Sequence, residues 1–296
     1  MWYYISMDLN PKTKLISEGL TLKLNSLANK LLAEGKNIIN LTAGELDFPT
    51  PLYIQKEIKR KVSLNKYTPT EGLSSLRQAI ADLICKDYKW KVAPQNVAVT
   101  SGSKQALFES MFAILKKGDE VIVPTPDWVT YRQQIILNDA KPIIVPLNEK
   151  FDLNVDEVKK AITKKTKAII LNSPNNPTGS IYSKASLLEL KKILRHKPIY
   201  VIVDDIYSKI IYDKTYKTPA LFAPQKKYLI LINGFSKSHA LTGWRIGFVI
   251  AEKKIIKAIT SFQSHTAGNA SLLSQIAAQK IIENGNQTEN FVKKLK

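Results

Sequence analysis

Cysteine and histidine are scarce in this chain of 296 residues, which holds one cysteine and three histidines. A single cysteine cannot form a disulfide within the chain, so we expect a reducing compartment, the cytoplasm. His196, His239 and His265 have no metal-ligand spacing among themselves or with Cys85, so we expect no metal site. Cys85 lies in the apolar run "AIADLICKDY", where we predict a small core residue and not a nucleophile.

Long apolar runs are also missing. No stretch reaches the length of a transmembrane helix. The opening residues "MWYYISMDL" have neither the basic segment nor the long apolar segment of a signal peptide. We therefore expect no membrane partner.

Acidic residues are outnumbered, with 25 Asp and Glu against 44 Lys and Arg, and the formal net charge is +19. Such a balance is typical of proteins that bind nucleic acid or an anionic membrane. The basic residues, however, are scattered as Lys–Lys pairs near the ends of predicted helices and form no basic arm. We therefore predict a lysine-rich surface with no nucleic-acid partner, and a basic nucleic-acid-binding protein stays open as an alternative.

Short apolar runs alternate with amphipathic segments from about residue 52 to residue 250. Runs of this kind between helices are typical of strands buried on both faces. We therefore predict an α/β fold with three layers, in which helices cover both faces of a mostly parallel sheet. The predicted strands are 96–100, 120–124, 141–147, 167–172, 199–205 and 228–233, and the predicted helices are 75–88, 104–118, 130–137, a segment beginning at Asn154, 184–196 and 271–285.

Small, polar or aromatic residues follow five of these strands. The carboxyl ends of parallel strands meet at one edge of a sheet, where α/β proteins bind their ligands. The sequence therefore predicts a site assembled from several segments. These segments are "SGSK", "TPDW", "SPNNPTG", "DIYSK" and "GFSK".

The first and last of these segments suit a phosphate group. Ser101, Gly102 and Ser103 lie between a strand and a helix, where exposed amides and the helix dipole attract an anion. The loop lacks the Walker pattern, so we do not expect a nucleotide there. Arg245 could clamp the same phosphate, and Ser236 could add a hydroxyl group.

The other segments suit a planar ring with a protonated nitrogen. Asp204 ends an apolar run, where a carboxylate is costly to bury unless it is paired. Tyr207 and Asn176 could bond an oxygen of the same ring, and Trp128 could stack on it, a core tryptophan being the alternative. Lys237, in a desolvated pocket rich in cations, would have a lowered pKa and could form a Schiff base. Together these features indicate pyridoxal 5'-phosphate.

Seven motifs in a fixed order cover about residues 41–247: "LTAGELDFPTP", "YTPTEGLSSLRQAI", "TSGSKQALF", "PTPDWVTY", "NSPNNPTG", "DDIYSKIIY" and "GFSKSHALTGWRIG". With them the chain resembles the class I and II pyridoxal-phosphate-dependent aminotransferases of fold type I, the family that includes aspartate aminotransferase. The resemblance implies a homodimer that transfers an amino group between an amino acid, of the aspartate or glutamate type, and a 2-oxo acid.

The resemblance also implies a role for each residue at a matching position. Lys237 would be the catalytic residue that forms the Schiff base and moves the α-proton, and Asp204 would keep the ring nitrogen protonated. Tyr67 would reach the phosphate of the neighbouring subunit. The implied cofactor contacts are Tyr67, Ser103, Lys104, Trp128, Asn176, Asp204, Tyr207, Ser236, Lys237 and Arg245, and the implied substrate contacts are Gly44, Trp128 and Asn176.

Relatives of this family continue beyond the helix predicted at 271–285. No segment after Arg245 has the "R-x-S" pattern that carries the family's carboxylate-binding arginine. The resemblance therefore implies a fragment, with an N-terminal arm and part of a small domain in residues 1–45 and a large cofactor-binding domain in residues 46–296. Two alternatives stay open on the same fold: a C–S lyase, and a cofactor-binding remnant with little activity.

Overall fold

One sheet of seven strands organises the chain, in the order β1-β7-β6-β5-β4-β2-β3. The computed structural model describes all residues except 1–8, 17–18, 43, 213–226, 286–292 and 296, so the opening residues that predict no signal peptide lie almost wholly outside the described part. Every neighbouring pair of strands is parallel except the two that include β7. The strands are β1 Val97–Thr100, β2 Glu120–Thr125, β3 Lys141–Pro146, β4 Thr166–Asn172, β5 Tyr200–Asp204, β6 Leu229–Gly234 and β7 Gly247–Ile250.

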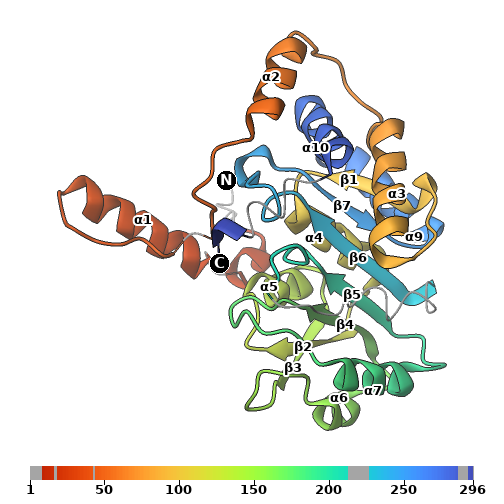
Figure 1. Ribbon diagram of the computed structural model, residues 1–296. Coiled ribbons are helices and arrows are strands. Elements are labelled where there is room, and N and C mark those ends of the chain that lie inside the picture. Colours follow the sequence, from red (N-terminus) through yellow and green to blue (C-terminus); the bar gives the residue numbers. More distant parts are fainter. Residues whose placement is uncertain (1–8, 17–18, 43, 213–226, 286–292, 296) are drawn as a thin grey trace, which may run out of the picture.

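Helices cover both faces of this sheet (Figure 1). Successive strand residues alternate between two apolar cores: Ile169 and Leu171 belong to one, and Ala168 and Ile170 to the other. The first core includes buried side chains of α3, α6, α7 and α10, and the second those of α4, α5 and α9. Since strands that are apolar on both sides must be covered on both sides, the predicted three-layer α/β fold is confirmed. The helices are α1 Leu20–Ala33, α2 Leu52–Lys61, α3 Ser74–Tyr88, α4 Ser103–Ile114, α5 Thr130–Leu137, α6 Val155–Ala161, α7 Lys184–Leu194, α9 Lys253–Ser264 and α10 Leu272–Asn284, with short 3-10 turns at Pro11–Lys14, Pro94–Asn96 and Thr242–Trp244.

Most of the predicted helices begin where the sequence indicates. Asn154 caps α6 by accepting a hydrogen bond from the Glu157 amide. The helix predicted at 104–118, however, ends at Ile114, because Leu115 takes up an extended conformation and the chain turns toward β2 before Gly118 is reached.

Cys85 is exposed, so the prediction that it is a core residue is wrong. The buried face of α3 is formed by Leu76, Ile80, Ala81, Ile84 and Tyr88. Because consecutive helix residues point about 100° apart, the position after Ile84 turns away from the sheet.

Helix α1 projects away from the layered part of the molecule (Figure 1). The division into an N-terminal arm and a large domain near residue 45 stays a prediction. Among the described helices, none has the length and apolar character needed to cross a membrane.

Candidate functional site

Strand register brings the predicted site segments to one edge of the sheet. Asn172 at the end of β4 pairs with Asp204 at the end of β5. Thr100 at the end of β1 and Gly234 at the end of β6 both pair with Gly247, the first residue of β7. The loops after four parallel strands therefore open at the same edge, as expected for a ligand site in an α/β protein.

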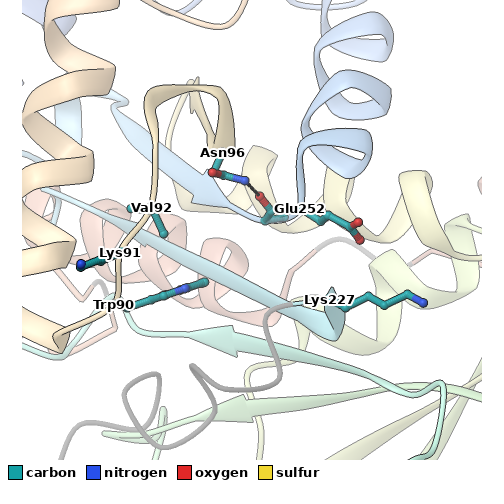
Figure 2. A pocket seen from close by; sticks show the side chains of 7 residues that line it. Trp90, Lys91, Val92, Asn96, Lys227 and Glu252 are labelled. Atoms are coloured by element: carbon teal, nitrogen blue, oxygen red, sulfur yellow. Dashed lines mark hydrogen bonds between the residues drawn. The ribbon is translucent and has the colours of Figure 1, made fainter.

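A separate cavity of about 260 Å³ lies at the other end of the strands (Figure 2). Asn96 precedes β1, Ala251 follows the antiparallel β7, and the Asn96 Nδ2 donates to the Ala251 carbonyl at 2.9 Å. None of the residues predicted for the site lines this cavity, whose walls are formed by Trp90, Lys91, Val92, Asn96, Lys227, Ala251 and Glu252.

The loop between β1 and α4 presents two backbone amides with no acceptor among the described residues, those of Ser103 and Lys104. They lie in the first turn of α4, where the helix dipole also favours an anion. Two glycines make room for the loop's neighbours. A Cβ on Gly102 would lie 2.5 Å from Arg245 Nη2, and a Cβ on Gly247 would lie 2.5 Å from the Ser103 nitrogen. The predicted phosphate loop and Arg245 are therefore in contact.

Arg245 supplies a positive charge that is not neutralised within the described part of the chain. Its Nη1 donates to the Thr242 carbonyl at 3.0 Å and its Nη2 approaches the Ser101 carbonyl at 3.5 Å, so its recorded partners are backbone oxygens. The guanidinium group also lowers the pKa of both Lys104 and Lys237, although burial is the larger cause in each case. Three cations thus share one region, which suits a bound anion.

Asp204 lies at the centre of the site and is 3% exposed. Its Oδ2 accepts from the Tyr131 hydroxyl at 2.8 Å, and its Oδ1 accepts from the Ile206 amide at 3.3 Å. Burial raises the pKa of this carboxyl group, while the two hydrogen bonds oppose the rise. A cationic partner would restore the ionised form. Sequence reasoning missed Tyr131, whose only signal is its place in the first turn of the helix that follows β2.

Asn176 and Tyr207, two of the predicted ring contacts, lie close to Asp204. The backbone N–H of Asn176 donates to Asn172 Oδ1 at 2.7 Å, which fixes this loop after β4. The Asn176 side chain is hydrogen-bonded to the Tyr207 hydroxyl, and this bond opposes the increase in the Tyr207 pKa caused by burial and by Asp204. The structure therefore brings all three predicted side chains together.

Lys237 is half-buried in the loop after β6, next to the buried Ser236. Its Nζ donates to the Gly44 carbonyl, which brings the N-terminal segment to the site. Burial lowers the pKa of Lys237, Arg245 lowers it further, and Glu45 opposes both. A larger share of this amine is therefore neutral at physiological pH than for an exposed lysine.

Trp128 lies close to Lys104 and Tyr131. The Lys104 Nζ is 5.0 Å from the centroid of the Trp128 ring, and the Trp128 and Tyr131 rings meet edge to face with centroids 5.5 Å apart. Tyr67, by contrast, is 96% exposed in the described part of the chain. Its predicted contact with a neighbouring subunit stays a prediction.

Two further side chains lie behind the β1–α4 loop and were missed by sequence reasoning. Gln105 Oε1 accepts from the Ser101 amide, and Gln105 Nε2 donates to Glu109 Oε1, both at 2.7 Å. Burial raises the pKa of Glu109 to about 7, against the opposing effect of the Gln105 hydrogen bond. An acidic residue among the buried positions of α4 is the signal that could have identified Glu109.

Known proteins match this chain in sequence over most of its length. The family model for aminotransferase class I and II matches residues 36–296. The aspartate aminotransferase of Thermotoga maritima is 39% identical over 267 residues, which are 89% of this chain and 71% of that protein. The probable aspartate/prephenate aminotransferase of Aquifex aeolicus is 36% identical over 93% of this chain and 71% of its own length.

Solved structures agree with these matches. The crystal structure of the Thermotoga maritima aspartate aminotransferase superposes with a TM-score of 0.91 at 37% identity, covering 96% of this chain and 76% of that structure. The Thermus thermophilus aspartate aminotransferase with maleate gives a TM-score of 0.92 at 32% identity, covering 97% and 76%. With the seven ordered motifs and the geometry above, these matches lead to one assignment: the chain belongs to the aminotransferase class I and II family.

Proposed function

We propose that this protein is a pyridoxal-phosphate-dependent aminotransferase that transfers an amino group from aspartate or glutamate to a 2-oxo acid. The observation that carries the proposal is that Lys237, Asp204 and Arg245 meet at one edge of the sheet. The sequence had predicted that the segments after five strands would form a ligand site at this edge. The names of the relatives support the choice of aspartate, since both sequence relatives described above are named for it.

The residues present fit pyridoxal phosphate. The free amides of Ser103 and Lys104 and the guanidinium group of Arg245 form an anion site suited to its phosphate. The buried carboxyl group of Asp204 suits its protonated ring nitrogen, because a cation there offsets the cost of burying the carboxylate. Lys237, with its lowered pKa, suits the attachment point.

When bound, pyridoxal phosphate supplies an electron-withdrawing ring that acidifies the α-carbon hydrogen of the substrate. The side chains of this protein position the reactants and move the proton. The neutral Nζ of Lys237 would accept the proton from the α-carbon of the substrate and carry it within the site. Asp204 would stabilise a positive charge on the ring nitrogen, and the Asn176 side-chain amide would supply a donor for the substrate carboxylate.

The reaction itself is tested by steady-state kinetics. With pyridoxal phosphate present, aspartate and 2-oxoglutarate are expected to yield oxaloacetate and glutamate, with parallel lines in double-reciprocal plots. The lines are parallel because the amino group stays on the protein between the two half-reactions. Release of ammonia and pyruvate from cysteine, without amino transfer, would contradict the proposal and favour the C–S lyase.

We propose further that Lys104 contributes to recognition of the distal carboxylate of the substrate. Its ammonium group lies 5.0 Å from the centroid of the Trp128 ring, although the residue as a whole is exposed, and partial burial and Arg245 lower its pKa. A hydrogen bond to a charged group contributes about 1.5–3 kcal/mol, so Lys104→Ser is expected to lower kcat/KM for aspartate and glutamate about 10- to 100-fold, and that for alanine much less. Lys117→Ser, at an exposed lysine beyond α4, is the matched control. Equal losses for all three amino acids would restrict Lys104 to the phosphate loop.

The homodimer is proposed on separate grounds. Tyr67, Ile39 and Leu41 are 96%, 85% and 87% exposed, and a partner subunit would cover such side chains. Sedimentation equilibrium is expected to give twice the mass of the chain, and Tyr67→Phe is expected to weaken cofactor binding if Tyr67 reaches the partner's phosphate site. A monomer at micromolar concentration would contradict this proposal. The cytoplasmic location stays a prediction.

A further inference from the structure

Three residues at four-residue spacing are joined by hydrogen bonds: Ser101 in the β1–α4 loop, and Gln105 and Glu109 in α4. Ser101 lies four residues before Gln105, and Glu109 lies four residues after it. Gln105 and Glu109 share a face of α4, and the Gln105 side chain also reaches back to the backbone of the loop that precedes the helix. Its Oε1 accepts from the Ser101 amide and its Nε2 donates to Glu109 Oε1, each at 2.7 Å.

Glu109 is 1% exposed, and its Oε2 has no hydrogen-bond partner in the described part of the chain. A carboxyl group in such a place destabilises the folded protein, because burial disfavours its charged form. None of the roles in the proposed reaction uses it. The neighbouring strands β1, β6 and β7 carry no titratable side chain, and the nearest helices, α9 and α5, carry Lys253, Lys254, Lys257, Tyr131 and Arg132.

The charge of Glu109 decides which way the Gln105 amide points. An ionised carboxylate only accepts hydrogen bonds, so it selects the orientation in which Nε2 faces Glu109 and Oε1 faces the Ser101 amide. A protonated carboxyl group can also donate, and it then tolerates the reversed amide, whose NH₂ group would face the N–H of Ser101. In the reversed orientation the backbone N–H of Ser101 has no acceptor on Gln105.

Ser101 connects this chain of hydrogen bonds to the phosphate site. Its carbonyl lies 3.5 Å from Arg245 Nη2, and the next residue, Gly102, contacts the same guanidinium group. The free amides of Ser103 and Lys104 follow directly. A loop held at Ser101 therefore presents its amides in a fixed direction.

We propose that Gln105 and Glu109 are positioning residues that hold the β1–α4 loop in its phosphate-binding conformation, and that ionisation of Glu109 strengthens this hold. The inference rests on the proposed function, because the loop is a phosphate site only if pyridoxal phosphate binds there. Since burial raises the pKa of Glu109 to about 7, the hold increases as the pH rises through neutrality.

The first test measures amide hydrogen exchange in the protein without cofactor. The protection factor of the Ser101 amide, corrected for the intrinsic pH dependence of exchange, is expected to rise between pH 6 and pH 8. Glu109→Gln keeps the shape of the side chain and is expected to remove this rise, whereas Gln105→Leu is expected to lower the protection about tenfold at both pH values. Asp82→Asn is the matched control, because Gln78 and Asp82 form the same i, i+4 pair at 2.9 Å on the exposed side of α3.

The second test compares two ligands, pyridoxal phosphate and pyridoxal, which lacks the phosphate. Gln105→Leu is expected to raise the Kd of pyridoxal phosphate about tenfold and to leave that of pyridoxal unchanged. Equal weakening for both ligands would indicate a general packing defect and overturn the inference, as would a flat pH profile of Ser101 protection in the unsubstituted protein. If the unsubstituted protein does not bind pyridoxal phosphate at all, the proposed function itself fails. If it binds normally and no variant differs, only the positioning role fails.

Discussion

Lys237→Ala is expected to abolish covalent attachment of pyridoxal phosphate and to lower transamination by at least about four orders of magnitude, while the protein still folds. The physical reason is that one amine serves as both the attachment point and the proton carrier. Its place in the loop after β6 and its hydrogen bond to the Gly44 carbonyl put it at the edge of the sheet, away from the packed core. Borohydride reduction followed by peptide mass spectrometry measures the attachment, and the label is expected on the peptide that contains Lys237.

Lys253→Ala, at an exposed lysine on α9, is the matched control and is expected to retain the label and the activity. Circular dichroism of both variants checks that the fold is kept. A label on any other lysine of the unsubstituted protein would contradict the assignment of Lys237, even if transamination were observed.

Asp204→Asn is expected to lower kcat about 1000-fold, because the variant keeps the shape of the side chain and loses its negative charge. Removing one member of a buried charge pair costs about 3–5 kcal/mol, and each 1.4 kcal/mol is a tenfold change in rate. Exchange of the α-hydrogen of aspartate for solvent deuterium, followed by proton NMR, isolates the step that depends on this charge.

Tyr131→Phe separates the charge from its hydrogen bond, because it removes the donor to Asp204 Oδ2 and leaves the carboxylate in place. A loss of about tenfold is expected for this variant, in line with one hydrogen bond to a charged group. Exchange in Asp204→Asn at a rate within tenfold of the unsubstituted protein would show that the carboxylate is not the partner of the ring nitrogen.

The same carboxyl group makes cofactor binding sensitive to acid. Burial raises the pKa of Asp204 in the protein without cofactor, and a bound cation would lower it again. Binding of pyridoxal phosphate is therefore expected to weaken as the pH falls, because acid protonates the carboxyl group that must be ionised to pair with the ring.

Much of this protein was determined by its sequence alone. The alternation of buried strands with amphipathic helices predicted the layers, because burial on both faces leaves a continuous apolar run and burial on one helix face leaves a 3.6-residue period. Asp204 was predicted as a site residue because it ends an apolar strand, and Asn176 and Lys237 because they follow such strands; the sheet does place these strand ends at one edge. These patterns are local, so they can be recognised in the sequence without knowledge of the fold.

Tertiary structure decided the contacts between distant segments. It inserted β7 antiparallel between β1 and β6, which places Gly247 against the phosphate loop. It brought the Gly44 carbonyl to Lys237 across 193 residues and the Tyr131 hydroxyl to Asp204 across 73. It also turned Cys85 outward and left Glu109 buried beneath the loop. The reason is physical. The local sequence pattern around a residue indicates whether that residue is buried. Its contact partners, however, depend on how distant segments pack, and the separation of two segments along the chain does not give their separation in space.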